Sequence, residues 1–137
     1  MPGLGGRVLE YALYHSPRDF VRTLLELGAD PNYAEPSGFP SLIAALSAGE
    51  RADRHEILEL LLVFGADIGQ RGINDYTPLH YAANLEDVAA MEILLRHGAD
   101  RAARTRIDHC ATPLEEAEIL NRTRSVAFLR RGRAEKD

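Results

Sequence analysis

The sequence predicts an all-helical protein built as a solenoid of about four stacked helix pairs, and three observations lead to that prediction. The tripeptide Gly-Ala-Asp begins at Gly28, Gly65 and Gly98, so its copies lie 37 and then 33 residues apart (28 to 65, 65 to 98). Each copy follows a run whose apolar residues recur at helical spacing. The motif Thr-Pro-Leu begins at Thr77 and again at Thr112. A regular repeat of this length is the signature of stacked supersecondary units.

The first two repeats are the more weakly marked. The first, approximately residues 4–33, has few apolar positions of helical spacing: Leu9, Ala12, Phe20, Val21, Leu24 and Leu25, followed by Gly28. The second, approximately residues 34–71, has a fuller set: Leu42, Ala45, Ile57, Leu58, Leu60, Leu61 and Leu62, followed by Gly65. Between its two expected helices the second repeat carries four extra residues, within 49–55.

The third and fourth repeats begin with the Thr-Pro-Leu motif. The third, approximately residues 72–104, supplies Leu79, Ala82 and Ala83 to one helix and Val88, Met91, Ile93, Leu94 and Leu95 to the next. The fourth, approximately residues 105–133, supplies Leu114 and Ala117, then Val126, Phe128 and Leu129. Four short helix-turn-helix units joined by β-turn or hairpin-like loops, in one domain over residues 1–137, are therefore expected.

Together these motifs resemble the ankyrin repeat. The run from Thr77 to Ala82 reads Thr-Pro-Leu-His-Tyr-Ala, as in the Thr-Pro-Leu-His-x-Ala signature of that family, and the resemblance extends from about Val8 to Gly132. It implies a fold that holds other proteins and seldom carries chemistry. It also implies that the first helix of each pair lines a concave face, and that His80 bonds backbone groups of a neighbouring turn.

The helix starts have a physical reading of their own. Thr77 is placed to accept amide bonds as an N-cap, and proline is tolerated directly after it because the first helical N–H has no partner in any case. Thr112 repeats this arrangement. The segment 16–19, Ser-Pro-Arg-Asp, predicts a third cap with Asp19 as a capping-box acid. Small residues in the first helices are expected to let neighbouring pairs approach closely: Ala44, Ala45, Ala82, Ala83 and Ala117.

Composition excludes several classes of function. A net charge of −5 argues against nucleic-acid binding, which requires a basic face. No apolar run is long enough to span a membrane, and residues 1–6 lack a signal-peptide pattern, so a cytoplasmic protein is expected. Cys110 is the only cysteine, so no intrachain disulfide is possible. Lys136 is the only lysine, a bias that indicates a GC-rich and hence bacterial genome.

Basic residues gather toward the end of the chain, on the last expected helix: Arg122, Arg124, Arg130, Arg131, Arg133 and Lys136. Two interpretations are open. The charges could simply solvate a helix that caps the stack, or they could form a docking patch for an acidic partner.

Candidate catalytic residues are few. His109 and Cys110 suggest a small thiol-dependent enzyme, but neighbours in sequence rarely present a nucleophile and its base to each other, and no orienting group is evident. No histidine, cysteine or carboxylate spacing matches a zinc site. We therefore predict no catalytic residue, no metal site and no cofactor, and keep the thiol enzyme as an alternative function.

The resemblance places the partner-binding surface on two parts of the stack. One is the tips of the turns that join consecutive repeats, and the other is the C-terminal ends of the inner helices, the first helix of each pair. The predicted contact residues of the tips are Glu35, Phe39, Arg71, Ile73, Asn74, Tyr76, Asp108 and His109. Those of the inner-helix ends are Tyr14, Ser47, Asn84 and Leu85. Large apolar residues at tips, such as Phe39 and Tyr76, favour a covering partner. Alternatively, each tip side chain packs locally on its neighbouring turn.

The expected function is that of a protein-binding module, an adaptor, inhibitor or immunity-type neutraliser that is monomeric when free. A purely structural or oligomerising unit is the other alternative.

Two of the tips depart from the repeat pattern. The glycine usual in the tip is present at Gly38 but replaced by Asp75 and Cys110, and cysteine tolerates positive φ poorly.

Overall fold

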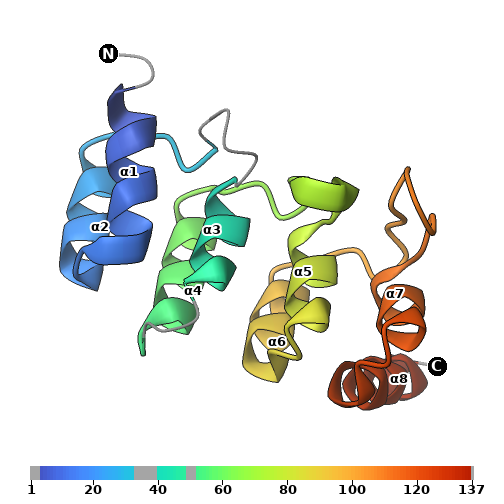
Figure 1. Cartoon of the computed structure of the whole chain (residues 1–137). Helices are drawn as coiled ribbons and strands as arrows, with labels where there is room; N and C mark the ends of the chain where they lie inside the picture. The colour runs from blue at the N-terminus through green and yellow to red at the C-terminus, as the bar shows by residue number, and fades with distance from the viewer. Residues whose placement is uncertain (1–3, 33–39, 49–51, 137) are drawn as a thin grey trace.

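The computed structural model describes residues 4–32, 40–48 and 52–136 (Figure 1). Within those ranges every regular element is helical and no strand occurs, as the sequence predicts. The elements are α1 (Leu4–His15), α2 (Arg18–Glu26), α3 (Ser41–Ser47), α4 (Arg54–Val63), the short 3₁₀-helix η1 (Ile73–Asp75), α5 (Pro78–Asn84), α6 (Val88–Arg96), α7 (Pro113–Ile119) and α8 (Thr123–Lys136). None of these helices is long and apolar enough to cross a bilayer.

The helices form four pairs that stack in chain order (Figure 1). The inner helices α1, α3, α5 and α7 each contact the next inner helix, and the outer helices α2, α4, α6 and α8 do the same. The turns before α5 and α7 project beyond the ends of those helices (Figure 1). Each pair therefore packs against its sequence neighbours, which is the organisation of a solenoid.

The core runs continuously through the stack. Leu9 of α1, Leu42 of α3 and Leu79 of α5 lie at its centre and are almost completely buried. The alanines predicted to allow close packing are all buried as well: Ala44, Ala45, Ala82, Ala83 and Ala117. Their burial agrees with the predicted role, because side chains that end at Cβ leave room for adjacent inner helices to approach closely.

Glycine ends the second helix of the first three pairs. Gly28, Gly65 and Gly98 have φ values of +100°, +97° and +93°, in the left-handed region that a side chain disfavours. The amide of the following alanine bonds back into the helix in each case, as in Ala99 N–H to Leu94 O at 3.0 Å. The glycine of the Gly-Ala-Asp motif is thus a helix terminator.

Two of the three predicted caps are present. Thr77 Oγ1 accepts the His80 amide at 3.3 Å, and Thr112 Oγ1 accepts the Glu115 amide at 3.2 Å. Both are capping boxes with proline at the next position. The predicted cap at Ser16 and Asp19 is wrong. Pro17 occupies the N-cap position of α2 and no side chain caps that helix, because proline has no side-chain acceptor.

Polar bonds join each repeat to the next. Asn32 donates to the carbonyl of Gly65 at 2.9 Å and accepts the amide of Asp67 at 2.6 Å. Asp87, the N-cap of α6, pairs with both Arg54 and His55 of α4, the latter at 2.7 Å. These bonds link residues about one repeat apart and set the register of the stack.

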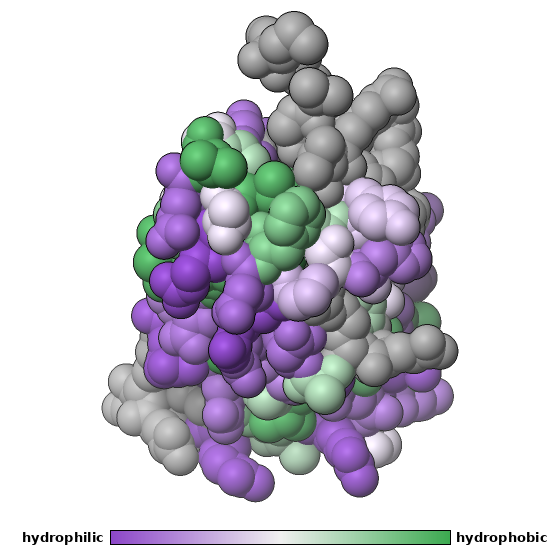
Figure 2. Space-filling view, turned by 90° about the vertical axis from the view of Figure 1, so that its left-hand side faces the viewer, coloured by the Kyte–Doolittle hydropathy of each residue, from purple (hydrophilic) through white to green (hydrophobic). Residues whose placement is uncertain are grey.

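The two ends of the stack expose what inner repeats bury. Phe20 occupies the place of Ile57 and Ala90, which are buried, but its own side chain is 45% exposed. The α1 and α2 end accordingly shows hydrophobic side chains gathered among hydrophilic ones (Figure 2). This follows from the absence of a preceding helix pair in the described part of the chain.

Replacing the capping threonines tests the cap assignments. Thr77→Ala and Thr112→Ala should each lower the free energy of unfolding by about 1 kcal/mol, because each leaves helix amides without an acceptor. Ser16→Ala is the matched control and should change it little, since α2 has no side-chain cap. Urea unfolding followed by helical circular dichroism measures all three. An equal loss in the control would contradict the assignment.

Candidate functional site

The third and fourth tips enclose a hollow of about 400 Å³ between them. Its lining comprises Asn74, Tyr76, Thr105, Asp108, His109 and Glu116. Four of these, Asn74, Tyr76, Asp108 and His109, are predicted contact residues that come from two different repeats. The fold therefore brings together side chains that the sequence places more than thirty residues apart.

Asp75 fixes the third tip to the fourth. Its carboxylate accepts a hydrogen bond from the backbone amide of Arg106 at 2.6 Å. It also accepts hydrogen bonds from Nε and Nη2 of the Arg106 side chain, at 3.0 and 2.7 Å. Arg71 Nη1 donates to it at 3.0 Å. These bonds, led by the Arg106 side chain, hold the pKa of Asp75 far below its ordinary value. The residue has φ of +60°, so a charged anchor stands where glycine is usual.

Tyr76 is a buried part of the same scaffold, so the prediction that it is a large apolar tip residue in need of a covering partner is wrong. It is only 7% exposed, its ring stacks on that of His80 with centroids 5.5 Å apart, and its hydroxyl donates to Glu116 at 2.5 Å. Burial and then the Glu116 bond raise its pKa, so the phenol stays protonated. The local-packing alternative describes Tyr76 correctly.

His80 has the structural role that the resemblance implies. Its Nε2 atom lies 2.8 Å from the carbonyl oxygen of Ala111 in the fourth tip, while Nδ1 faces the amide and hydroxyl of Thr77. Burial lowers its pKa, although the bond to Ala111 opposes that shift. A neutral ring that donates from Nε2 and accepts at Nδ1 satisfies this pattern.

Glu116 forms the floor of the hollow. Burial raises its pKa, but hydrogen bonds from Tyr76 and His109 outweigh burial and leave the pKa lowered, so the group is an anion. His109 Nδ1 lies 2.8 Å from Oε1 of this carboxylate. Cys110 is exposed at φ of +48°, and no bond joins its thiol to His109 in the described part of the chain. This geometry does not favour a thiol-dependent enzyme.

Exposed polar groups surround that fixed floor. Asn74 and Asp108 are exposed, and the His109 side chain is 45% exposed. Asn74 and Asp108 both have positive φ, as asparagine and aspartate tolerate. Among the described residues no group of histidine, cysteine and carboxylate side chains could hold a metal ion. The hollow can form hydrogen bonds and ion pairs with a molecule that enters it.

The other predicted contact residues lie elsewhere. Arg71 is tied to Asp75 and donates to the Arg104 carbonyl at 2.9 Å, so it serves the scaffold. At the inner-helix ends Ser47 bonds the Tyr81 hydroxyl, Asn84 accepts from Arg122, Tyr14 is partly buried and Leu85 is 47% exposed. Glu35 and Phe39 lie outside the described residues, as does the side chain of Ile73.

Sequence reasoning missed the acid at the centre of this site. Glu116 reads as one of three acids at a helix start, and Arg106 as an ordinary turn residue. One signal was available. Glu116 comes three residues after Pro113 and next to Ala117, so helical spacing places it on the same buried face of α7. A charge on a buried face requires a partner.

Asp75→Asn should lower the free energy of unfolding by about 2 kcal/mol at neutral pH, because it removes charge-assisted bonds. Its hydrogen bonds to Arg106 hold the pKa of Asp75 in the folded protein below its ordinary value of about 3.9 in an unfolded chain. Its stabilising effect is thus complete above that pH and is lost as the pH falls below it. Urea unfolding from about pH 7 down to about pH 2 should show the difference between the two proteins narrowing.

In the same experiment, Asp75→Gly distinguishes the contribution of the Asp75 charge to stability from the contribution of its backbone conformation. Glycine relieves the positive φ but cannot bind Arg106. We expect it to destabilise as well, and a stabilised Asp75→Gly protein would show that backbone strain outweighs the ion pairs.

Tyr76→Phe should destabilise the fold by about 1–2 kcal/mol, because it removes the hydroxyl that donates to the buried Glu116 carboxylate. Tyr81→Phe is a control of the same chemistry, since the Tyr81 hydroxyl accepts a hydrogen bond from Ser47 at a partly exposed position and, among the described residues, forms no hydrogen bond with a charged group. Thermal and urea unfolding measure both. Equal, small effects would show that the bond to Glu116 contributes little.

Known proteins share this repeat pattern. A family model described as ankyrin repeats (3 copies) matches residues 41–137. An ankyrin repeat protein of Fowlpox virus is 36% identical over 104 residues, 75% of this chain and 29% of its own length. The RelA-associated inhibitor of Mus musculus is 29% identical over 73% of this chain and 12% of its own. Alpha-latroinsectotoxin-Lt1a of Latrodectus tredecimguttatus is 30% identical over 88% of this chain and 8% of its own.

Few properties of these similar proteins can be transferred to this chain. The chain spans less than a third of the length of each. They come from a virus and two animals, so a bacterial source stays a prediction. Ankyrin repeats are in general protein–protein interaction modules and typically not enzymes. From the motifs, the stacked helix pairs and the matching family model, the chain belongs to the ankyrin repeat family.

Proposed function

We propose that this chain binds a partner protein through its tips and inner-helix ends, with the hollow between the third and fourth tips at the centre of the contact. The observation that carries the proposal is the convergence of Asn74, Asp108 and His109, from two repeats, on one hollow. Their side chains are available to a partner, whereas the residues beneath them are committed to the fold.

Rigidity supports this role. The bonds of Asp75 to Arg106, of His80 to Ala111 and of Tyr76 to Glu116 all cross from the third repeat to the fourth. They hold both tips in one relative position before any partner arrives. A surface that is already ordered loses less conformational entropy on binding, so its contacts contribute more fully to affinity.

The charge of the hollow indicates what part of the partner enters it. Asp108 and the ionised Glu116 place two carboxylates there, against a single histidine. A basic side chain of the partner complements them, with Asn74 as a further hydrogen-bonding group. Leu85, exposed at the end of α5, adds an apolar contact on the inner-helix side.

The role of such binding is that of an adaptor, inhibitor or neutraliser. The RelA-associated inhibitor, one of the similar proteins, is by its name an inhibitor, which favours inhibition for this chain too. We further propose one domain over residues 1–137, monomeric when free, acting in the cytoplasm on protein rather than nucleic acid.

Affinity capture with matched baits tests the proposal. Asn74→Arg and Asp108→Arg should each abolish recovery of a partner that the unchanged chain retains, because each puts a cation into an acidic hollow. Neither residue is part of the buried network, so circular dichroism should show an intact fold. Arg96→Glu, a charge change of similar size on the outer helix α6, should leave recovery unchanged.

Two results would contradict this proposal. One is a partner recovered equally by the Asn74→Arg, Asp108→Arg and unchanged baits, which would place its contact elsewhere. The other is a defined homo-oligomer by light scattering that Asn74→Arg disrupts, which would assign the surface to self-assembly.

A further inference from the structure

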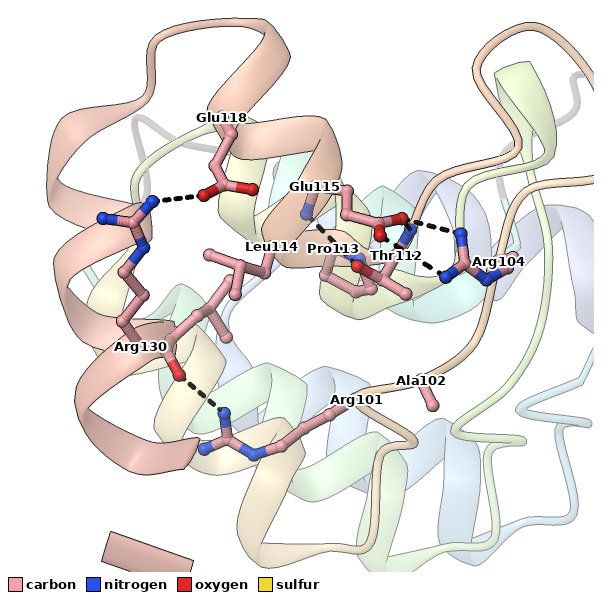
Figure 3. A pocket seen from close by; sticks show the side chains of 10 residues that line it. Arg101, Ala102, Arg104, Thr112, Pro113, Leu114, Glu115, Glu118 and Arg130 are labelled. Carbon is pink, nitrogen blue, oxygen red and sulfur yellow. Dashed lines mark hydrogen bonds and ion pairs between the residues drawn. The ribbon is translucent and has the colours of Figure 1, made fainter. Parts of the chain in front are cut away.

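A second and larger hollow, of about 740 Å³, lies at the C-terminal end of the stack between α7, α8 and residues 101–104. Arg101 and Arg104 from this loop and Arg130 from α8 surround it (Figure 3). It shares no lining residue with the hollow between the tips. Its walls therefore form a distinct surface, which the proposed partner contact does not use.

Two of these arginines, Arg101 and Arg130, stand where the second and third repeats have apolar residues. Arg101 follows Gly-Ala-Asp, as Ile68 does one repeat earlier, and Arg130 follows the buried Leu129, as Leu95 follows the buried Leu94. Ile68 and Leu95 both pack against the core. Neither position needs a cation to complete the repeat fold, so the two charges call for another explanation.

The positive charge in this hollow exceeds the negative charge available to it. Arg104 pairs with Glu115 at 2.7 Å, and Arg130 pairs with Glu118, but all four side chains are between 39% and 62% exposed. Such pairs contribute little energy and rearrange readily. Arg101 has no carboxylate partner among the described residues. Its Nη1 donates to the Leu129 carbonyl at 3.1 Å, and its buried Nε has no acceptor.

The floor of the hollow is apolar. Pro113, Leu114 and Leu129 line it, and Leu114 is only partly buried although the equivalent Leu79 and Leu42 are completely covered. A volume of this size accommodates a ligand of several hundred cubic ångströms. An apolar floor with a rim of guanidinium groups suits a chain segment that carries both apolar side chains and carboxylates.

We propose that this hollow binds an acidic peptide segment of a protein, with its carboxylates on Arg101 and Arg130 and an apolar side chain on Leu114. Arg104 can join them by releasing Glu115. Glu115 and Glu118 disfavour a nucleic acid, whose continuous row of phosphates would meet both carboxylates. Arg130 of α8 thus serves a specific anion-binding site, together with Arg101.

Fluorescence anisotropy with a labelled peptide of alternating glutamate and leucine tests the site. Arg101→Gln and Arg130→Gln should each weaken its binding by about tenfold or more, the loss expected when a charge-assisted bond disappears. Arg124→Gln is the matched control, because it removes the same charge from an exposed position on α8 outside the hollow. It should weaken binding by less than about twofold, through long-range electrostatics alone.

Further variants and ligands distinguish specific binding in this hollow from unfolding and from binding elsewhere on the chain. Arg130→Gln leaves the Arg101 bond to Leu129 intact, so it remains informative even if Arg101→Gln unfolds. The same peptide with glutamine for glutamate should not bind. Asn74→Arg should bind the acidic peptide normally, which separates this site from the tip hollow. Equal losses in all three arginine variants, no binding of the acidic peptide, or tighter binding of a single-stranded oligonucleotide of equal charge would each overturn the proposal.

Discussion

The packing of each helix pair against the next is the constraint on which the whole molecule depends. No pair encloses a core alone. Leu42 and Leu79 are fully buried because a neighbouring pair covers them, whereas Phe20 and Leu114, at the two ends, stay partly exposed. Stability is therefore a sum of nearest-neighbour contacts. The position of every tip follows from the helix pair that carries it.

A layer of polar bonds then converts loosely connected tips into a rigid surface. Asn32 reaches the second repeat, Asp87 holds α4 against α6, and His80 reaches the fourth tip. Each bond spans about one repeat, so each exists only when the helices are already stacked. The packing of the helices and the hydrogen bonds between repeats therefore stabilise one another. At both candidate binding surfaces, exposed polar groups lie beside residues that these bonds hold in place.

Most of the scaffold could be predicted from the sequence, and part of the site could not. Thr77, Thr112, His80 and the three Gly-Ala-Asp glycines behave as the repeat pattern predicts, because their partners are local or occupy the same place in every repeat. Tyr76 was misplaced because its burial depends on an acid in the next repeat. Asn74, Asp108 and His109 were found as tip residues, but their meeting in one hollow was not evident from their spacing.

The helices, their pairing and the family follow from the sequence alone, because periodicity and caps depend on residues a few positions apart and the same pattern recurs in each repeat. Which side chains are available for binding depends on the stacked structure. Tyr76 and Glu116 are 40 residues apart, and Asp75 and Arg106 are 31 apart, yet each pair is joined by hydrogen bonds. Whether a tip residue is anchored or exposed depends on such distant partners, and only the stacked structure brings them within reach.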